Sequence, residues 1–403
     1  MASSVSPPRG MRDFLPADKA RREQVLGVIR STYRAHGFDE IETPVMEDST
    51  RLHAGLGGDN EKLAFGVLRR GLTLDDLAAA SDPLDLADLG LRFDLTVPLT
   101  RFYATHRSVL PAVFHSIQIA PVWRAERPQK GRYRQFLQCD IDIIGEAGTL
   151  AEIELISATA ATLDALGLDG CTIRLNDRRI LRGLTDYAGV APEHFDRVLV
   201  VIDKEDKIGI AGVVAELAES GLGDAVRIES ALQLARAVAD GGWALLDDPP
   251  VWLDVDAYRS LVDIRNAVGS AAEVVFSPLL VRGMGYYTGA IFEIAHPSST
   301  SSLGGGGRYD GMIGRFLGVD VPAAGFSIGF ERIVDLVELP DDGSADAAAL
   351  VFDDGVEPVR LLELQSALLA EGAERVRLEH RPRNLKALLE QLAVSGFARV
   401  AMV

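Results

Sequence analysis

The segment IQIAPVWRAERPQKGRYRQFLQCDIDIIG, residues 117–145, decides the fold prediction because it predicts two β-strands joined by a long basic loop. Successive side chains of a strand point to opposite faces. In the second strand the odd positions are mostly apolar. The even positions form the other face and are Arg134, Phe136, Gln138, Asp140 and Asp142. An arginine, an aromatic ring, an amide and two carboxylates on one face suit a site for a small zwitterion and a nucleotide, whereas the alternative is the solvated face of an edge strand.

The loop between these strands concentrates positive charge in a chain whose formal net charge is -18. Clustered cations bind phosphate groups, and the guanidinium fork of arginine does so with two hydrogen bonds. A charge run is often only solvated surface, but its place between two strands of an acidic protein favours a phosphate site. The charged residues of the loop are Arg124, Glu126, Arg127, Lys130, Arg132 and Arg134.

Length and composition narrow the class of protein. A chain of 403 residues predicts two or three domains, and 47% hydrophobic residues allow a sizeable core. Two cysteines, Cys139 and Cys171, exclude a disulfide scaffold and a cysteine-rich zinc site and suit a reducing cytoplasm. The N-terminus has no apolar signal, and no apolar run reaches the roughly 18 residues of a membrane span, so we expect a cytoplasmic protein without membrane contact. The first ten residues are expected to be a flexible lead-in.

Residues 122–136, VWRAERPQKGRYRQF, with Gln138 and Asp142 closely resemble motif 2 of class II aminoacyl-tRNA synthetases, in the form typical of histidyl-tRNA synthetases. Four further stretches resemble the family's other motifs in the family's order. The predicted helix 18–36 with the strand 38–45 resembles motif 1, RGMGYYTG (282–289) and LGGGGRYDG (303–311) resemble two histidine-specific motifs, and PAAGFSIGFERIVDLV (322–337) resembles motif 3. Many members have an aspartate where Gly285 stands.

Local patterns predict three further features. Residues 91–101 alternate as a strand does, so Arg92, Asp94 and Thr96 should share a face. Thr149 and Glu152 have the spacing of a helix capping box, and that helix should run to about Leu166. Four consecutive glycines, 304–307, indicate either a close backbone approach to a ligand or a mobile loop.

The resemblance implies an α/β (α+β) fold with four parts. The class II catalytic domain, a mostly antiparallel sheet flanked by helices, would comprise residues 1–176 and 266–340, and residues 177–265 would form an inserted helical module that contacts the tRNA acceptor arm. After a linker at 339–346, residues 347–403 would form a strand–helix–strand–helix–strand unit, which resembles a shortened anticodon-binding domain. The chain would be a homodimer.

The resemblance also implies the chemistry, which is ATP-dependent ligation of L-histidine to tRNA(His) through a histidyl-adenylate, with Mg²⁺ bridging the phosphates and no protein metal site. Arg124 and Arg282 would hold the α-phosphate, Phe136 would stack on adenine, and Arg332 would hold the γ-phosphate, with Glu126 and Arg132 completing the ATP site. Asp94, Thr96 and Gln138 would bind the ammonium group of histidine, whose carboxylate Arg282 also contacts. Asp142 would accept an imidazole N–H, with Tyr286, Tyr287 and Tyr309 around the ring.

Two other functions stay open from the sequence. A histidine-sensing regulatory subunit of ATP phosphoribosyltransferase would share the catalytic fold and lack the anticodon domain, which makes the short C-terminal region relevant. Against it, Arg124, Arg132, Arg282 and Arg332 form a complete phosphate-binding set. A ligase for another acceptor is possible, although no feature of the sequence favours it.

Overall fold

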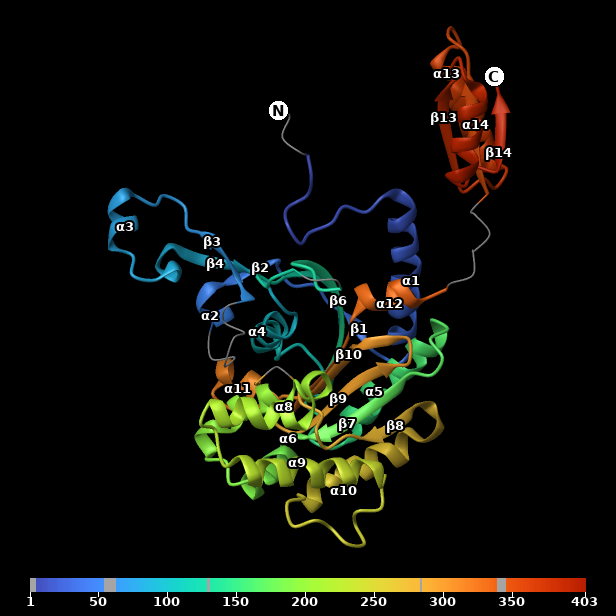
Figure 1. Ribbon diagram of the computed structural model, residues 1–403. Coiled ribbons are helices and arrows are strands. Elements are labelled where there is room, and N and C mark those ends of the chain that lie inside the picture. The colour runs from blue at the N-terminus through green and yellow to red at the C-terminus, as the bar shows by residue number, and fades with distance from the viewer. Residues whose placement is uncertain (1–4, 54–62, 129–130, 283–284, 339–345) are drawn as a thin grey trace. The chain divides into compact units, whose positions relative to one another are not determined.

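The computed structural model describes residues 5–53, 63–128, 131–282, 285–338 and 346–403 (Figure 1). Two compact units divide the chain. The larger comprises Met1–Asp13 with Arg22–Val337, and the smaller comprises Phe14–Arg21 with Glu338–Val403. Lys130 of the basic cluster and most of the predicted linker lie outside the described residues.

An eight-stranded sheet forms the centre of the larger unit, with the order β1-β5-β6-β11-β10-β9-β7-β8. The pairs β1–β5 and β7–β8 are parallel and the other pairs are antiparallel, which confirms the predicted sheet. The strands are β1 (Asp39–Glu40), β5 (Phe114–Trp123), β6 (Gln135–Ile144), β7 (Thr172–Asp177), β8 (Glu273–Phe276), β9 (Ala290–His296), β10 (Ser299–Arg308) and β11 (Ala323–Ile328).

Helices flank this sheet, as predicted. α5 and α12 pack on β6, while α10 packs on β7, and all regular structure described between residues 178 and 268 is helical (Figure 1). Within the described ranges, no helix has both the length and the apolar character needed to cross a membrane. The helices are α1 (Pro16–Ala35), α2 (Ser49–His53), α3 (Leu74–Ala79), α4 (Thr96–His106), α5 (Leu150–Ala165), α6 (Arg178–Tyr187), α7 (Phe195–Ile202), α8 (Glu205–Glu219), α9 (Ala225–Asp240), α10 (Val255–Val268), α11 (Gly311–Leu317) and α12 (Phe330–Leu336).

The predicted motif 2 hairpin is present, with β5 and β6 paired along their full length from Phe114↔Ile144 to Trp123↔Gln135. β11 pairs with the other edge of β6, so β6 is an interior strand of the sheet. All residues from Gln138 to Ile144 are buried, on both faces. The alternative of a solvated edge strand is therefore wrong, because the polar face of β6 is covered.

The predicted strand at residues 91–101 is wrong. A small antiparallel sheet of β2 (Met46–Asp48), β4 (Ala87–Leu91) and β3 (Phe65–Leu68) ends at Leu91, and α4 begins at Thr96. Asp94 accepts a hydrogen bond from the Val97 amide (3.2 Å), which satisfies one of the free N–H groups of the helix start. Pro98 lies in the first turn, where a missing N–H costs nothing.

The predicted motif 1 strand is shorter than residues 38–45, because β1 contains only Asp39 and Glu40. Arg92 explains the interruption. Its guanidinium donates to the carbonyl oxygens of Thr43 (2.7 Å) and Pro44 (3.3 Å). Those carbonyls are therefore bound to a side chain rather than to a neighbouring strand.

The predicted capping box is also absent, although α5 is present. Thr149 makes no side-chain capping bond. The buried Glu152 carboxylate instead accepts from Arg308 Nε (2.6 Å) and a terminal guanidinium nitrogen (2.7 Å). A buried ion pair between distant segments therefore replaces the local cap.

The glycine run lies inside β10 rather than in a mobile loop. A Cβ atom on Gly306 would come within 1.9 Å of the Gly325 carbonyl oxygen, and one on Gly305 within 2.7 Å of the Arg282 guanidinium carbon. Close approach of the chain's own backbone and side chains therefore explains this run, and close approach to a ligand stays a prediction.

The smaller unit contains the predicted strand–helix–strand–helix–strand order. β12 (Ala347–Phe352) is the central strand and pairs in parallel with β13 (Arg375–His380) and β14 (Arg399–Met402). α13 (Pro358–Ala370) and α14 (Leu385–Val394) are the connecting helices, and Leu392 and Phe397 pack on the alanines of β12. Its similarity to an anticodon-binding domain stays a prediction.

Candidate active site

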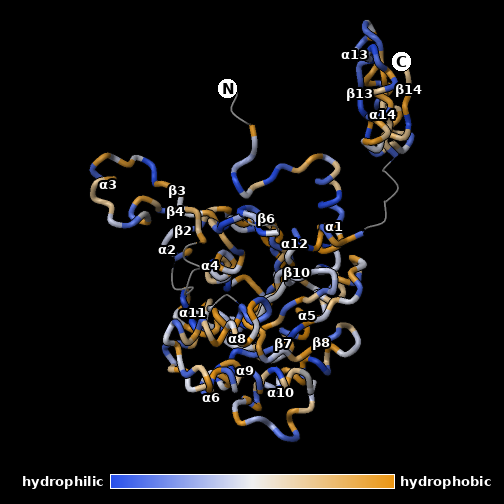
Figure 2. The backbone as a smooth tube through the Cα atoms, in the orientation of Figure 1, coloured by the Kyte–Doolittle hydropathy of each residue, from blue (hydrophilic) through white to orange (hydrophobic). Residues whose placement is uncertain are grey.

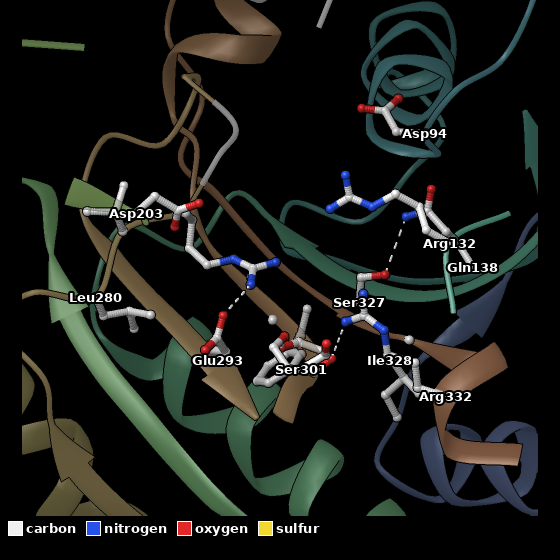
Figure 3. A pocket seen from close by; sticks show the side chains of 18 of the residues that line it. Asp94, Arg132, Gln138, Asp203, Leu280, Glu293, Ser301, Ser327, Ile328 and Arg332 are labelled. Carbon is white, nitrogen blue, oxygen red and sulfur yellow. Dashed lines mark hydrogen bonds and ion pairs between the residues drawn. The ribbon is translucent and has the colours of Figure 1, made fainter. Parts of the chain in front are cut away.

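A cavity of about 880 Å³ lies over β6, β9, β10 and β11 in the larger unit (Figure 3). All thirteen residues predicted as site residues line it, although they come from segments up to about 240 residues apart. They are Asp94, Thr96, Arg124, Glu126, Arg132, Phe136, Gln138, Asp142, Arg282, Tyr286, Tyr287, Tyr309 and Arg332.

Three buried carboxyl groups line the cavity. Asp94, Asp140 and Asp142 are 2%, 5% and 4% exposed. Burial raises the pKa of Asp94 to about 6 and that of Asp140 to about 7, because the ionised forms lose hydration. Burial, and then the Asp140 charge, raise the pKa of Asp142 well above its usual value. In the free site, ionisation of all three carboxyl groups is therefore unfavourable. A bound cation would make their ionisation more favourable.

Among these carboxyl groups and the adjacent Gln138, two polar atoms are buried without a hydrogen-bond partner among the described residues. They are Asp94 Oδ2 and Gln138 Oε1. The amide nitrogen of Gln138 is engaged, because it donates to Asp140 Oδ2 (3.2 Å) and Ser327 Oγ (3.3 Å). Figure 3 shows Gln138 directed toward Ser327. Buried acceptors normally have a donor, so both atoms point to a ligand that donates hydrogen bonds.

Tyrosines surround the third carboxylate. Tyr309 Oη donates to Asp142 Oδ1 (2.6 Å), and the Tyr286 ring lies 6.0 Å from the Tyr309 ring and 4.8 Å from the Tyr287 ring. Burial raises the pKa of all three hydroxyls, so they remain protonated donors at neutral pH. This arrangement can enclose a small planar polar ring.

Arginines also line the cavity, and Arg124 lies close enough to the buried carboxyl groups for its charge to lower the pKa of Asp94 and of Asp140. Arg124 Nε donates to the Phe93 carbonyl (3.0 Å), and its guanidinium carbon lies 5.0 Å from the Phe136 ring centre. Arg332 donates to the Ser302 carbonyl, and Arg132 pairs with Glu126 (3.1 Å). Burial, and then repulsion from Arg132 and Arg282, lower the pKa of Arg332. The cations repel one another, and a bound polyanion would relieve this repulsion.

The sequence prediction missed Glu331, which supports β6 from α12. Its carboxylate accepts from Arg22 (2.7 and 2.8 Å), from Arg12, and from the Leu137 amide of β6 (3.1 Å). In the sequence, only its position next to Arg332, at the start of a predicted helix, pointed to Glu331. Asp140, quoted for its place on the strand face but not assigned to the site, is a second omission.

Residues 10–12, where the expected flexible lead-in ends, pack against the motif 2 loop, whereas residues 5–9 are exposed and residues 1–4 lie outside the described residues. The Arg134 amide donates to the Gly10 carbonyl (2.8 Å), and the Arg12 guanidinium lies over the Tyr133 ring at 3.5 Å. Gly10 has a positive φ of 84°, and a Cβ there would lie 2.8 Å from the Pro128 side chain. The lead-in therefore supports one side of the loop.

Replacing Glu331 with glutamine should destabilise the larger unit by about 3 kcal/mol at pH 7, because Arg12 and Arg22 would lose a buried counter-ion. Burial raises the pKa of Glu331, but the hydrogen bond and charge of Arg22 outweigh it and leave that pKa lowered. The ion pairs of Glu331 therefore stabilise the fold fully at a pH above the ordinary carboxyl pKa. This stabilisation is lost as the pH falls through the lowered pKa of Glu331 in the folded protein. Thermal unfolding should show a gap between wild type and Glu331→Gln that narrows with falling pH.

The matched control is Glu40→Gln, because Glu40 also pairs with two arginines, Arg30 (3.0 Å) and Arg34 (2.8 Å) of α1, but at a more exposed position. It should change stability by less than about 1 kcal/mol. Equal effects of the two substitutions would contradict the supporting role of Glu331.

Similarity to known proteins extends over nearly the whole chain. Residues 10–333 match the family model described as histidyl-tRNA synthetase. A histidine–tRNA ligase of Leifsonia xyli subsp. xyli is 61% identical, covering 100% of this chain and 96% of that protein, and a probable histidine–tRNA ligase of Tropheryma whipplei is 41% identical, covering 98% and 94%.

Two solved structures share the fold. The histidyl-tRNA synthetase of Nostoc sp. PCC 7120 has a TM-score of 0.73 at 24% identity and covers 98% of this chain and 90% of its own. A Bacillus halodurans protein titled ATP phosphoribosyltransferase regulatory subunit/histidyl-tRNA synthetase has a TM-score of 0.77 at 20% identity and covers 100% and 99%. The chain belongs to the histidyl-tRNA synthetase family.

Proposed function

We propose that the cavity performs the activity for which the chain's curated relatives are named, so that this chain ligates L-histidine to tRNA(His) in two steps, using ATP. The observation that carries the proposal is that one cavity holds two kinds of group. Buried carboxyl groups with unpaired acceptors line it, and so do arginines, among which Arg132 and Arg282 repel Arg332. Histidine offers donors to the carboxyl groups, and ATP offers a polyanion to the arginines.

Histidine would bind at the carboxyl groups. Its ammonium group would donate to Asp94 Oδ2 and Gln138 Oε1, with Thr96 beside them, because these acceptors have no other described partner. Its imidazole would donate to Asp142, which Tyr309 already holds in place, and Tyr286 and Tyr287 would close the pocket. A buried polar pocket rejects apolar analogues, because its groups would then stay unpaired.

ATP would bind at the arginines. Phe136 would stack on adenine, Arg124 and Arg282 would hold the α-phosphate from two sides, and Arg332 would hold the γ-phosphate. Arg132, with Glu126 beside it, would add charge from the motif 2 loop. The Arg332–Ser302 contact uses one guanidinium nitrogen, and the guanidinium has two further nitrogens that could donate to the phosphate.

The chemistry needs no protein nucleophile. A histidine carboxylate oxygen attacks the α-phosphorus in line, and the bond from that phosphorus to the bridging oxygen of the β-phosphate breaks, releasing pyrophosphate. A terminal ribose hydroxyl of tRNA then attacks the carbonyl carbon of the adenylate, loses its proton, and AMP leaves. The residues act by positioning the reactants and by stabilising developing negative charge.

Magnesium would reach this site mainly through ATP. The described residues contain no group of three histidine, cysteine or acidic side chains able to hold a metal. Mg²⁺ commonly uses one or two carboxylates together with substrate phosphates. Glu126, which lines the cavity beside Arg132, fits such a single ligand. A bound Mg²⁺ would neutralise charge on the phosphates.

The remaining assignments are also proposals. The helices of residues 177–265 would contact the tRNA acceptor arm, and residues 347–403 would be the anticodon-binding-like part. The motif 1 segment would form a homodimer interface, and the enzyme would act in the cytoplasm. The regulatory-subunit alternative is weaker, because a histidine sensor does not need the four arginines Arg124, Arg132, Arg282 and Arg332.

Histidine-dependent ATP–pyrophosphate exchange on the purified chain tests the function directly. Exchange with histidine and with no other amino acid would support adenylation, and transfer to tRNA(His) would then test the second step. Histidine binding without exchange would overturn the proposal in favour of a regulatory subunit.

Arg282→Ala should lower the exchange rate by about 10²- to 10³-fold, because one side of the developing α-phosphate charge loses its donor. ATP binding should weaken much less, since Arg124, Arg132 and Arg332 remain. Equilibrium ATP binding measured beside the exchange rate separates the two effects. Comparable losses in both would contradict the assigned role.

Histidine binding should release protons near pH 6, because Asp94 has a raised pKa of about 6 in the free site and the ligand's ammonium favours its ionised form. Because of this raised pKa, Asp94 in the free site becomes protonated as the pH falls toward 6. Histidine binding at that pH releases the proton. Calorimetry in two buffers of different ionisation enthalpy should show about half a proton more per site for wild type than for Asp94→Asn.

Titration of the histidine imidazole is common to both proteins. Removing the Asp94 charge also lowers the pKa of Asp140, so the difference in proton release reports Asp94 together with its effect on Asp140. Equal proton release by wild type and Asp94→Asn would show that Asp94 does not bind the ammonium group.

A further inference from the structure

Arg282 is held by a single carboxylate at the edge of the cavity. Its guanidinium donates to Glu293 Oε2 (2.9 Å), and this is the only hydrogen bond described for that side chain. Its Nε atom is buried without a partner among the described residues. Close packing on Gly305 limits the guanidinium on one side but does not fix its direction. Tyr287 and Asp203 also interact with the Arg282 charge, but Glu293 accepts its described hydrogen bond and is therefore the group that can direct the guanidinium.

Glu293 is in turn held by Arg174. The two residues lie directly opposite each other in the β7–β9 pair, and Arg174 pairs with Glu293 Oε1 at 3.5 Å. The two oxygens of Glu293 are thus divided between two arginines, with Oε1 facing Arg174 and Oε2 facing Arg282. A carboxylate held at both oxygens has less freedom to rotate than one held at a single oxygen.

Arg174 is itself fixed from two further directions. Ser277 Oγ accepts from its Nε (3.3 Å) and from a terminal nitrogen (3.0 Å), and Asp206 at the start of α8 pairs with its other terminal nitrogen (3.2 Å). The planar fork of arginine can make all these contacts at once, whereas a lysine cannot. Arg174 therefore connects the strand, the loop after β8 and the helix α8.

A second carboxylate lies near Arg282. Asp203 lines the same side of the cavity as Glu293 in Figure 3, and burial raises its pKa while the Arg282 charge lowers it. If Glu293 were free to turn away, Arg282 could pair with Asp203 and leave its place beside the reacting groups. The contact with Arg174 at 3.5 Å, from the nitrogen that also pairs with Asp206, would oppose such a turn.

We propose that Arg174 and Glu293 are positioning residues for adenylate formation, with Arg174 fixing Glu293 and Glu293 aiming the Arg282 guanidinium into the cavity. This inference rests on the proposed function and adds two residues to its machinery. The competing explanation is that the ion pairs only stabilise the fold. The two explanations differ in one respect, because a positioning role acts only through Arg282.

The test is a double-mutant cycle on pyrophosphate exchange with the full chain. Arg174→Met should lower kcat by about 10- to 100-fold, since a guanidinium displaced by about 1 Å loses much of its effect, and should change KM for ATP little. In the Arg282→Ala background the same substitution should change kcat less than about twofold, because its target is absent. Glu293→Gln should behave in the same way.

Two variants keep the test sharp. Arg178→Met breaks another arginine–aspartate pair with a helix of this region, to Asp196 at 2.7 Å, and should leave exchange unchanged. Ser277→Ala removes an uncharged hydrogen-bond acceptor of Arg174 and should lower kcat by a smaller factor than Arg174→Met. It provides the test if Arg174→Met folds poorly. Thermal unfolding of each variant monitors the fold.

Each outcome decides the question. Loss of kcat only when Arg282 is present supports the positioning role. An equal loss of kcat with Arg282 present and in the Arg282→Ala background overturns it. So does the absence of any loss for Arg174→Met and Ser277→Ala when Arg282 is present and the parent protein is active. Absence of exchange in wild type would instead remove the proposed function.

Discussion

The rest of the structure depends on one electrostatic constraint, the burial of Asp94, Asp140 and Asp142 in a single site. Moving a carboxylate out of water is expensive unless it is paired or hydrogen-bonded, and the raised pKa values of these groups record that expense. Internal donors such as Tyr309, Ser327 and the Val97 amide satisfy part of the site. The acceptors that remain unpaired make the site of the free enzyme complementary to a cationic ligand that donates hydrogen bonds.

The sheet makes room for these groups through glycines. Gly325 lies directly opposite Asp142 in the β6–β11 pair, where a Cβ would come within 2.0 Å of Asp142 Oδ1. Gly306, one strand further, has the Gly325 carbonyl where its Cβ would be. Side chains at these positions would displace the carboxylate or separate the strands. Glycine weakens these strands, but it also leaves the space that the buried Asp142 carboxylate occupies.

Much of this arrangement was predictable from sequence because it is local and periodic. The alternation along residues 134–142 predicted the polar face of β6, and family motifs identified the arginines and tyrosines around it. Asp94 was placed on a strand because its neighbours alternate, whereas Val97 and Pro98 begin a helix there. Glu152 fits a local cap but pairs with Arg308, 156 residues away. Arg174 and Glu293, 119 residues apart, meet only through sheet register, which no local pattern encodes.

The proposed binding mode also accounts for where the reaction would occur. In that binding mode the histidine ammonium and imidazole would bind the carboxyl groups and the phosphates would bind the arginines, so the attacking carboxylate would lie between them. There the carboxylate would be repelled by Asp94 and Asp140 and attracted by Arg282. The direction in which Arg282 points would therefore set the position of the carboxylate oxygen relative to the α-phosphorus. A residue that does not touch the substrate could then control the rate through Arg282, because the proposed chemistry depends on positioning rather than on proton transfer or a protein nucleophile.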